Sequence, residues 1–225
     1  MDFDFLPITL SFKLAAITSF LLLIIGIPIA YLLASSKSRI KFMFEAILSL
    51  PLVLPPSVLG FYLLLAFAPD SYIGKMASDI FGLSLVFTFE GIVIASIIYS
   101  FPFMVQPIQS ALENLPQSIT EASYTLGKSR FQTLVYVLLP NIKPAILVGT
   151  VLSFAHTVGE FGVVLMIGGN IPGETRVASL AVFDEVESLN YDQAHFYSLI
   201  LLISSFLIIM LVYWINRRNK ISVGI

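Results

Sequence analysis

Long stretches without any charged side chain constrain the fold of this chain more than any other feature. A helix needs about 20 apolar residues to cross a bilayer core of roughly 30 Å. Four uncharged stretches exceed that length, and a fifth reaches it if the acid Glu160 lies inside the span. They are residues 14–36, 46–69, 91–112 and 193–216, with 144–165 as the fifth. The sequence therefore predicts an all-α, polytopic membrane protein with five transmembrane helices.

The overall composition supports a membrane protein and excludes other classes. Of the 225 residues, 57% are apolar and 12% are charged, and a soluble domain carries about twice that charged share. The net charge of −2 is too balanced for a nucleic-acid-binding surface, so no nucleic-acid partner is expected. The chain has no cysteine, which excludes disulfides, thiolate metal sites and a cysteine nucleophile.

Basic residues predict the orientation in the membrane, because they concentrate next to the cytoplasmic ends of spans. Nine of the twelve follow the first, third and fifth spans, namely Lys37, Arg39, Lys41, Lys128, Arg130, Lys143, Arg217, Arg218 and Lys220. We therefore expect the N terminus outside and the C terminus in the cytoplasm. No linker or repeat divides the chain, which indicates a single transmembrane domain, 1–225. Five helices barely surround one another, so we expect a homodimer.

Small residues and prolines indicate how the spans pack. Gly26, Ala30 and Ala34 recur every fourth residue of the first span, a spacing that lets helices approach closely in lipid. Packing within one subunit is the favoured interpretation. The second span contains three prolines, Pro51, Pro55 and Pro56. Each removes a backbone N–H, and broken helices often mark the pathway of a transporter. A simple kink is an equal alternative for any single proline, so only this cluster carries weight.

The segment 113–143 is too polar to cross the membrane and predicts two short helices on the cytoplasmic side. A stripe of small and apolar residues defines the first helix, Ile119, Ala122, Ser123 and Leu126. Ser118 with Glu121 has capping-box spacing, and Asn114 with Gln117 offers a second start. Gly127 is placed to end this helix.

The second short helix begins at Ser129, which has Gln132 three residues later, and it is expected to stop at Pro140. Two short helices held between spans can dock in a groove of a soluble partner. A helix lying on the lipid surface is the alternative, but the small residues of the stripe give little membrane affinity.

One motif in this segment resembles a known family. Glu121-Ala122-Ser123, then Gly127, then Val137-Leu-Leu-Pro140 has the spacing of the EAA loop of ATP-binding-cassette import permeases, E-A-A-x-x-x-G-x(9)-I-x-L-P. Serine replaces the second alanine and valine the isoleucine. The resemblance implies that this loop holds the coupling helices, which seat in an ATPase subunit, with Glu121, Ala122, Ser123 and Gly127 in that role.

Other segments resemble the molybdate branch of these permeases: 50–56 with Gly60, 100–104, 159–162 and 170–176. The resemblance implies the fold of a type I importer permease in the bacterial cytoplasmic membrane, two ATPase subunits and an extracytoplasmic oxyanion-binding protein. It implies ATP-driven molybdate import with no cofactor on this chain, since ATP and Mg belong to the ATPase. The alternatives are a tungstate or sulfate permease, then a membrane enzyme or a passive channel.

The chain itself lacks a nucleotide site. Gly127-Lys128-Ser129 imitates the end of a phosphate-binding loop, but that motif requires glycine where Ala122 stands. ATP is therefore expected to be hydrolysed by a partner, and the chain is not expected to be an enzyme.

One face of the fourth span is polar and small, with Gly149, Ser153, His156 and Glu160 at helical spacing. Ionisable groups inside a membrane usually face an interior and mark functional sites, so Ser153, His156 and Glu160 are pathway or gate candidates. For His156, hydrogen-bonded packing is favoured over substrate contact. The spacing H-x-x-x-E lacks a third metal ligand, so no metal is expected.

Glu160 would repel a dianionic substrate, so we expect a structural or gating pair between Glu160 and Arg176. Arg176 belongs to an outer loop, 167–192, that is rich in glycine and acids. Val177, Leu180 and Ala181 predict a short helix there. This loop is expected to close the outer mouth and to meet the substrate-delivering protein.

Overall fold

The computed structural model describes residues 3–221, with side chains for 3–214, and this part of the chain is entirely helical outside its turns. The side chains of Arg217, Arg218 and Lys220, which entered the orientation argument, lie outside the described residues. Three helices are long and apolar enough to cross a membrane, and the number rises to five if each of two bent helix pairs is one span.

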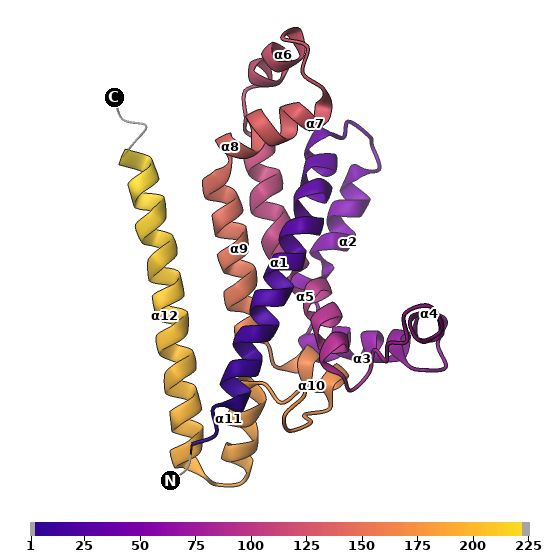
Figure 1. Cartoon of the computed structure of the whole chain (residues 1–225), viewed down its shortest axis with the longest axis vertical. Helices are drawn as coiled ribbons and strands as arrows, with labels where there is room; N and C mark the ends of the chain where they lie inside the picture. The colour runs from indigo at the N-terminus through magenta and orange to yellow at the C-terminus, as the bar shows by residue number, and fades with distance from the viewer. Residues whose placement is uncertain (1–2, 222–225) are drawn as a thin grey trace.

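Three helices form the centre of the bundle: α1 (Leu6–Ser35), α5 (Phe89–Glu113) and α9 (Lys143–Val158). They pack side by side in Figure 1. Gly26 of α1 lies against Met104 of α5, and a Cβ at Gly149 of α9 would stand 2.9 Å from the Met104 carbonyl oxygen. Ala30 is fully buried. Gly26 and Ala30 of the small-residue stripe in the first span therefore pack within the subunit, as the favoured interpretation predicted.

The second predicted span is broken. Helix α2 (Lys41–Val53) meets α3 (Pro56–Phe67) at an angle of 114°. Pro55 has an extended backbone (ψ 136°) and Pro56 starts α3, so the helix ladder cannot continue through the pair. The proline cluster thus produces a sharp break rather than a mild kink.

The prediction of one helix through 144–165 is wrong. Helix α9 ends at Val158 and α10 (Gly162–Gly168) begins after a turn that contains Glu160. The Gly159 N–H still bonds to the Ala155 carbonyl, but the next N–H, of Glu160, bonds only three residues back, to Thr157. The last turn is therefore tightened into a 3-10-type turn where α9 ends, and Glu160 does not extend the polar face of α9.

Helix α12 (Tyr191–Ile221) lies at the edge of the bundle in Figure 1, where it packs against α9 and α11. Only 6% of its most apolar stretch is buried inside the protein, against 56% for α5. Its exposed side chains include Leu202 and Phe206. A helix with this apolar surface needs lipid or another protein around it.

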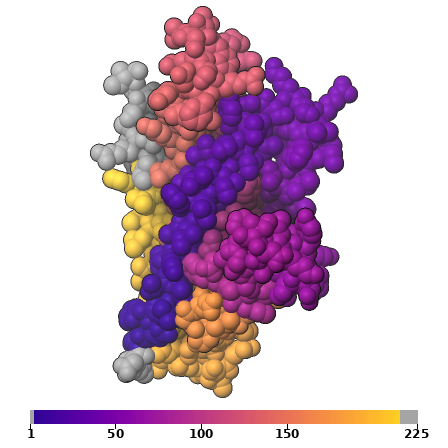
Figure 2. Space-filling model, turned by 45° about the vertical axis from the view of Figure 1, so that its right-hand side comes forward, coloured from indigo at the N-terminus to yellow at the C-terminus, as the bar shows by residue number. Residues whose placement is uncertain are grey.

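The connecting segments lie at opposite ends of the bundle (Figure 1). At one end are α6 (Gln117–Thr125), α7 (Arg130–Thr133), the π-helical turn Leu134–Leu138 and α8 (Leu139–Asn141). At the other end are α10 and α11 (Ala178–Glu187). Figure 2 shows α1 running along one face between these ends, with α4 (Tyr72–Phe81) in the mass that projects beside it. The two polar segments therefore occupy opposite ends, as the sequence predicted.

The predicted outer helix is present as α11. It begins directly after Val177, and Val177, Leu180 and Ala181 are buried. The backbone N–H of Ala178 donates to the Ser11 hydroxyl of α1 at 2.8 Å. This bond fastens the outer segment to the first span.

Candidate functional site

The first short helix of the polar end, α6, starts earlier than the Ser118 capping box predicted. Pro116 precedes the helix, and no side chain caps it. The Ile119 N–H bonds to the Pro116 carbonyl instead. Proline fixes its own backbone angle and has no N–H that needs a partner. The helix begins at Gln117, so neither predicted cap is correct: Ser118 lies inside α6, and Asn114 follows the end of α5.

The turn between α6 and α7 follows the sequence prediction. Gly127 has φ +76°, the left-handed conformation that ends helices. The Lys128 N–H then bonds back to the Ser123 carbonyl at 3.2 Å. Ser129 and Gln132 form a complete capping box at the start of α7. The two short helices are therefore held at a fixed angle by local hydrogen bonds.

The second helix does not stop at Pro140, contrary to the prediction. A π-helical turn, Leu134–Leu138, precedes the proline, and the Leu139 N–H bonds five residues back to Leu134. The widened turn is compatible with the missing proline N–H, and the Asn141 side chain donates to the Val137 carbonyl at 2.7 Å. The helical path ends at Asn141 and bends by 79° into α9.

The three residues of the EAA motif point in different directions. Glu121 and Ala122 are exposed on the outer side of α6, whereas Ser123 is only 4% exposed. The Ser123 hydroxyl lies 2.9 Å from the Thr133 hydroxyl of α7. Glu121 and Ala122 can therefore contact a partner directly, and Ser123 ties the two helices together.

His156 occupies an ordered polar niche on α9. Its Nδ1 lies 2.9 Å from the Ser100 hydroxyl of α5, and that hydroxyl also lies 2.9 Å from the Thr157 hydroxyl. The rings of Tyr99 and Phe103 pack against the imidazole at 4.6 and 4.2 Å between centroids. These are the contacts of a hydrogen-bonded packing residue.

Glu160 is buried in the turn after α9, with 3% of its surface exposed. Neither carboxylate oxygen has a hydrogen-bond partner among the described residues, and the nearby Ser96 hydroxyl of α5 is also buried without one. The Glu160 backbone carbonyl accepts from Ser179 of α11 at 2.6 Å. The turn is thus tied to α11 through the backbone and not through the carboxylate.

The expected pair between Glu160 and Arg176 is wrong. The Arg176 Nε lies 3.0 Å from Asp184, and its Nη2 lies 3.6 Å from Glu185. Both acids belong to α11, and Asp184 also accepts two bonds from Asn170. Arg176 lies two residues before α11, so it reaches acids of that helix, while the turn after Val158 holds Glu160 inside the bundle.

The two broken spans meet beside this turn. A Cβ at Gly162, the first residue of α10, would stand 2.7 Å from the Pro56 Cβ at the start of α3. A cavity of about 600 Å³ lies here, open on one side and lined by residues that include Ser57, His156 and Glu160. Ser153, the third pathway candidate, is fully buried and does not line it. Helix breaks around a cavity are the usual setting of a transporter's substrate path.

Sequence reasoning missed a polar cluster between α2 and α5. Lys41 of α2 lies 2.7 Å from Glu113 and 3.5 Å from Glu45. Gln109 donates to both acids, and Gln106 donates to Ser49 at 3.0 Å. Two glutamines three residues apart inside an apolar span were the available signal. Within the described residues, no group of three metal-ligating side chains is present.

Comparisons with known proteins identify the family. Residues 26–220 match the family described as "Binding-protein-dependent transport system inner membrane component". The chain belongs to this family. Its members are permease subunits of ATP-binding-cassette importers in the inner membrane, and a separate subunit hydrolyses ATP. Membership implies an ATPase partner and a substrate-binding protein. The permease is therefore not an enzyme and carries no cofactor of its own.

Several relatives align over nearly the whole permease. "Molybdenum transport system permease protein ModB" of Azotobacter vinelandii is 45% identical over 219 residues, which covers 97% of this chain and 96% of the relative. The protein of the same name in Escherichia coli strain K12 is 34% identical and covers 99% and 98%. "Sulfate transport system permease protein CysT" of the same strain is 32% identical and covers 87% and 70%.

Solved structures confirm the fold. The methionine transporter MetNI in an inward-facing conformation matches with a TM-score of 0.71 at 18% identity, covering 94% of each chain. A bacterial transporter for the import of alginate matches with a TM-score of 0.76 at 17% identity, covering 95% of this chain and 78% of the other. The permease thus has the type I importer fold that the EAA resemblance implied.

Proposed function

We propose that this chain is the permease subunit of an ATP-driven molybdate importer. The observation that carries the proposal is the 45% identity, over 97% of the chain, with a protein named as a molybdenum transport permease. A relative named as a sulfate permease is 32% identical and aligns over a smaller share of the chain. Sulfate is therefore the second candidate, and tungstate is the close chemical analogue.

The proposed assembly is a homodimer with two ATPase subunits, which hold ATP and Mg, and an extracytoplasmic oxyanion-binding protein. The N terminus lies outside, so the end with α6 and α7 faces the cytoplasm and the end with α11 faces the binding protein. The one-sided cavity beside Glu160 supports a pathway completed by a second copy. The acidic outer loop 167–192 does not attract a free oxyanion, so delivery by a binding protein is required.

Coupling runs through α6. Glu121 and Ala122 on its exposed side contact the ATPase, Gly127 sets the angle to α7, and Ser123 locks the two helices. Since α5 ends at Glu113 and α9 begins at Lys143, a displacement of this segment moves two central spans at once. Closure of the ATPases on ATP then swings the spans as rigid bodies and opens the opposite end. The permease thus alternates between two helix packings, and its partners shift the equilibrium between them.

The pathway follows the seam where the two helix breaks meet. Ser153 and His156 support the wall of this seam, and Glu160 holds the turn after α9 as a gate and not as an anion ligand. Arg176 holds the start of α11 closed against Asp184 and Glu185. Opening of the outer end requires that α11 and the turn after α9 move together, because Ser179 joins them.

Uptake by the reconstituted transporter tests the substrate. The permease, ATPase and binding protein are placed in vesicles, and entry of labelled molybdate is measured with and without ATP. We expect uptake only with ATP and all partners, competition by tungstate, and no competition by equal sulfate. Flux without nucleotide would identify a passive channel, and stronger competition by sulfate would assign the chain to sulfate import.

Substitution on α6 tests coupling. Ala122→Glu places a charge and added volume on the exposed side of α6, and we expect it to abolish co-purification with the ATPase and uptake. The control is Ser78→Glu, at an exposed small residue of α4, which adds the same charge away from the polar end. Normal ATP-coupled uptake by the Ala122→Glu variant would refute the coupling role.

A further inference from the structure

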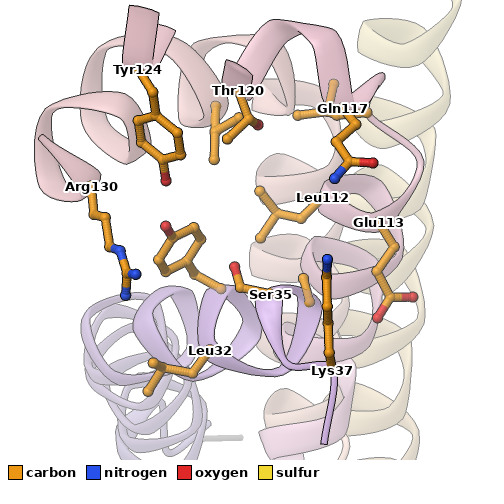
Figure 3. Close-up of a pocket in the computed structure, with 13 residues that line it drawn as sticks. Leu32, Ser35, Lys37, Leu112, Glu113, Gln117, Thr120, Tyr124 and Arg130 are labelled. Carbon is orange, nitrogen blue, oxygen red and sulfur yellow. The ribbon is translucent and has the colours of Figure 1, made fainter. Parts of the chain in front are cut away.

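A second cavity lies outside the proposed pathway. It has a volume of about 630 Å³ and separates the last turns of α1 from the α6–α7 segment (Figure 3). The end of α5 forms its third wall. The coupling and transport arguments above assign no role to this space.

The cavity carries an excess of positive charge. Lys37, just after α1, and Arg130, at the start of α7, line opposite sides of it in Figure 3. Neither forms an ion pair with another described residue. Glu113 is the acid in the lining, and it is already bound to Lys41 at 2.7 Å and to Gln109 at 2.9 Å. Two cations therefore face the cavity while its carboxylate is neutralised elsewhere.

Hydroxyl groups add hydrogen-bond donors to the same walls. Ser35 and Tyr31 of α1 and Thr120 and Tyr124 of α6 line the cavity. Partial burial and a hydrogen bond with Tyr31 raise the pKa of the Tyr124 phenol, so this hydroxyl stays protonated. Guanidinium, ammonium and hydroxyl groups around one space are the donors that bind phosphate oxygens.

The cavity also lies at the level expected for the membrane surface. Helix α1 has 30 residues and rises about 45 Å, whereas the hydrocarbon core is roughly 30 Å thick. A crossing of about 20 residues that begins at Leu14, directly after Lys13, ends near Leu33, so Ser35 and Lys37 lie at the headgroup layer. Leu32 and Leu112 give the cavity an apolar part, which suits the glycerol or acyl portion of a lipid.

We propose that this cavity binds the phosphate group of an anionic ligand, with Lys37 and Arg130 as its two cations and Ser35 and Thr120 as neutral donors. The phosphate comes either from the headgroup of an anionic phospholipid or from a soluble phosphate ester. The proposal does not depend on which oxyanion the permease transports.

Native mass spectrometry of the permease assembled with its ATPase tests this site. Phosphatidylglycerol, phosphatidylcholine and glycerol 3-phosphate are added separately, and bound adducts are counted. The variant Lys37→Gln/Arg130→Gln is compared with Arg39→Gln/Lys128→Gln, which removes two exposed cations outside the cavity lining. We expect the cavity variant to lose roughly tenfold in affinity for the bound phosphate compound, and the control variant to change less than about twofold.

The three added compounds distinguish a lipid headgroup from a soluble phosphate ester, and the two double variants show whether the cavity is the binding site. Adducts with phosphatidylglycerol but not phosphatidylcholine assign the site to a lipid, and adducts with glycerol 3-phosphate assign it to a soluble ester. Two outcomes would overturn the proposal. One is an equal loss of affinity in both double variants, and the other is no adduct with phosphatidylglycerol or with glycerol 3-phosphate. If the double variant fails to assemble, Lys37→Gln alone, at an exposed residue outside any helix, must still weaken binding, while Lys37→Arg must retain it.

Discussion

At the scale of single residues, Glu160 and Arg176 belong to two separate arrangements. The Glu160 carboxylate is buried beside Ser96, and Arg176 is held by acids of α11. Groups without shared partners affect stability independently. Loss of either charge therefore removes a different set of side-chain contacts.

A double-mutant cycle measures this independence. Glu160→Gln and Arg176→Gln should change the thermal stability of the assembled transporter additively, with a coupling free energy below about 0.5 kcal/mol. The matched cycle, Arg176→Gln with Asp184→Asn, should be non-additive by at least about 0.5 kcal/mol because those groups form an ion pair at 3.0 Å. A coupling free energy well above that value between Glu160 and Arg176 would show that the two side chains do interact, contrary to the structure.

The Ser123 hydroxyl gives a second prediction at this scale. It is paired with Thr133 in a buried position, so Ser123→Ala should destabilise the α6–α7 segment by about 1 kcal/mol. Thr133→Val should cost a similar amount, and the double variant should cost little more than either one. Hydrogen–deuterium exchange of residues 117–133 measures the effect, and additive losses would show that the two hydroxyls do not act as a pair.

At the scale of elements, the turn between α6 and α7 can be tested against a matched turn elsewhere. Gly127 and Gly82 both have positive φ, +76° and +64°, and a Cβ at either position meets nothing within 4 Å. Alanine therefore costs about 1 kcal/mol at each site through the backbone alone. We expect Gly127→Ala to reduce transport per ATP hydrolysed, and Gly82→Ala to leave that ratio unchanged. If both variants transport the same amount per ATP hydrolysed, the angle between α6 and α7 plays no part in coupling.

The sequence predicted where the helices lie better than where they break. Absence of charge determines which segments partition into lipid, but it says nothing about the direction of a helix within the bundle. Prolines revealed the break at Pro55, whereas the break at Glu160 was hidden because glycine and one acid also fit an intact helix. The capping box at Ser129 and the turn at Gly127 were predictable, since both depend on neighbours along the chain.

The partners of the site residues were harder to predict for the same physical reason. His156 and Ser100 are far apart in sequence, and their contact depends on how α5 packs against α9. Arg176 forms ion pairs with Asp184 and Glu185 because α11, which carries both acids, begins two residues later. The cluster around Lys41 was missed because its members come from two helices, and their contact depends on how α2 packs against α5.

At the scale of the whole molecule, two surfaces of the protomer have different expected neighbours. The cavity beside Glu160 opens to one side where α3 and α10 meet, and a pathway there is complete only if a second copy covers it. Helix α12 has an apolar surface that contacts little of the rest of the chain, and lipid satisfies it. A homodimer in the proposed arrangement therefore buries the first surface and leaves the second against lipid.

Crosslinking distinguishes these two surfaces without interference, because the native chain has no cysteine. Ser57→Cys places a thiol at the cavity, and Leu202→Cys places one on α12, where the native side chain is 66% exposed. With a short bifunctional maleimide in native membranes, we expect a crosslinked dimer from Ser57→Cys and monomer from Leu202→Cys. ATP with a hydrolysis inhibitor should change the yield at Ser57→Cys, since the seam moves during transport. A dimer formed only through Leu202→Cys would place the interface on α12 and leave the cavity facing lipid, where a pathway for an oxyanion cannot exist.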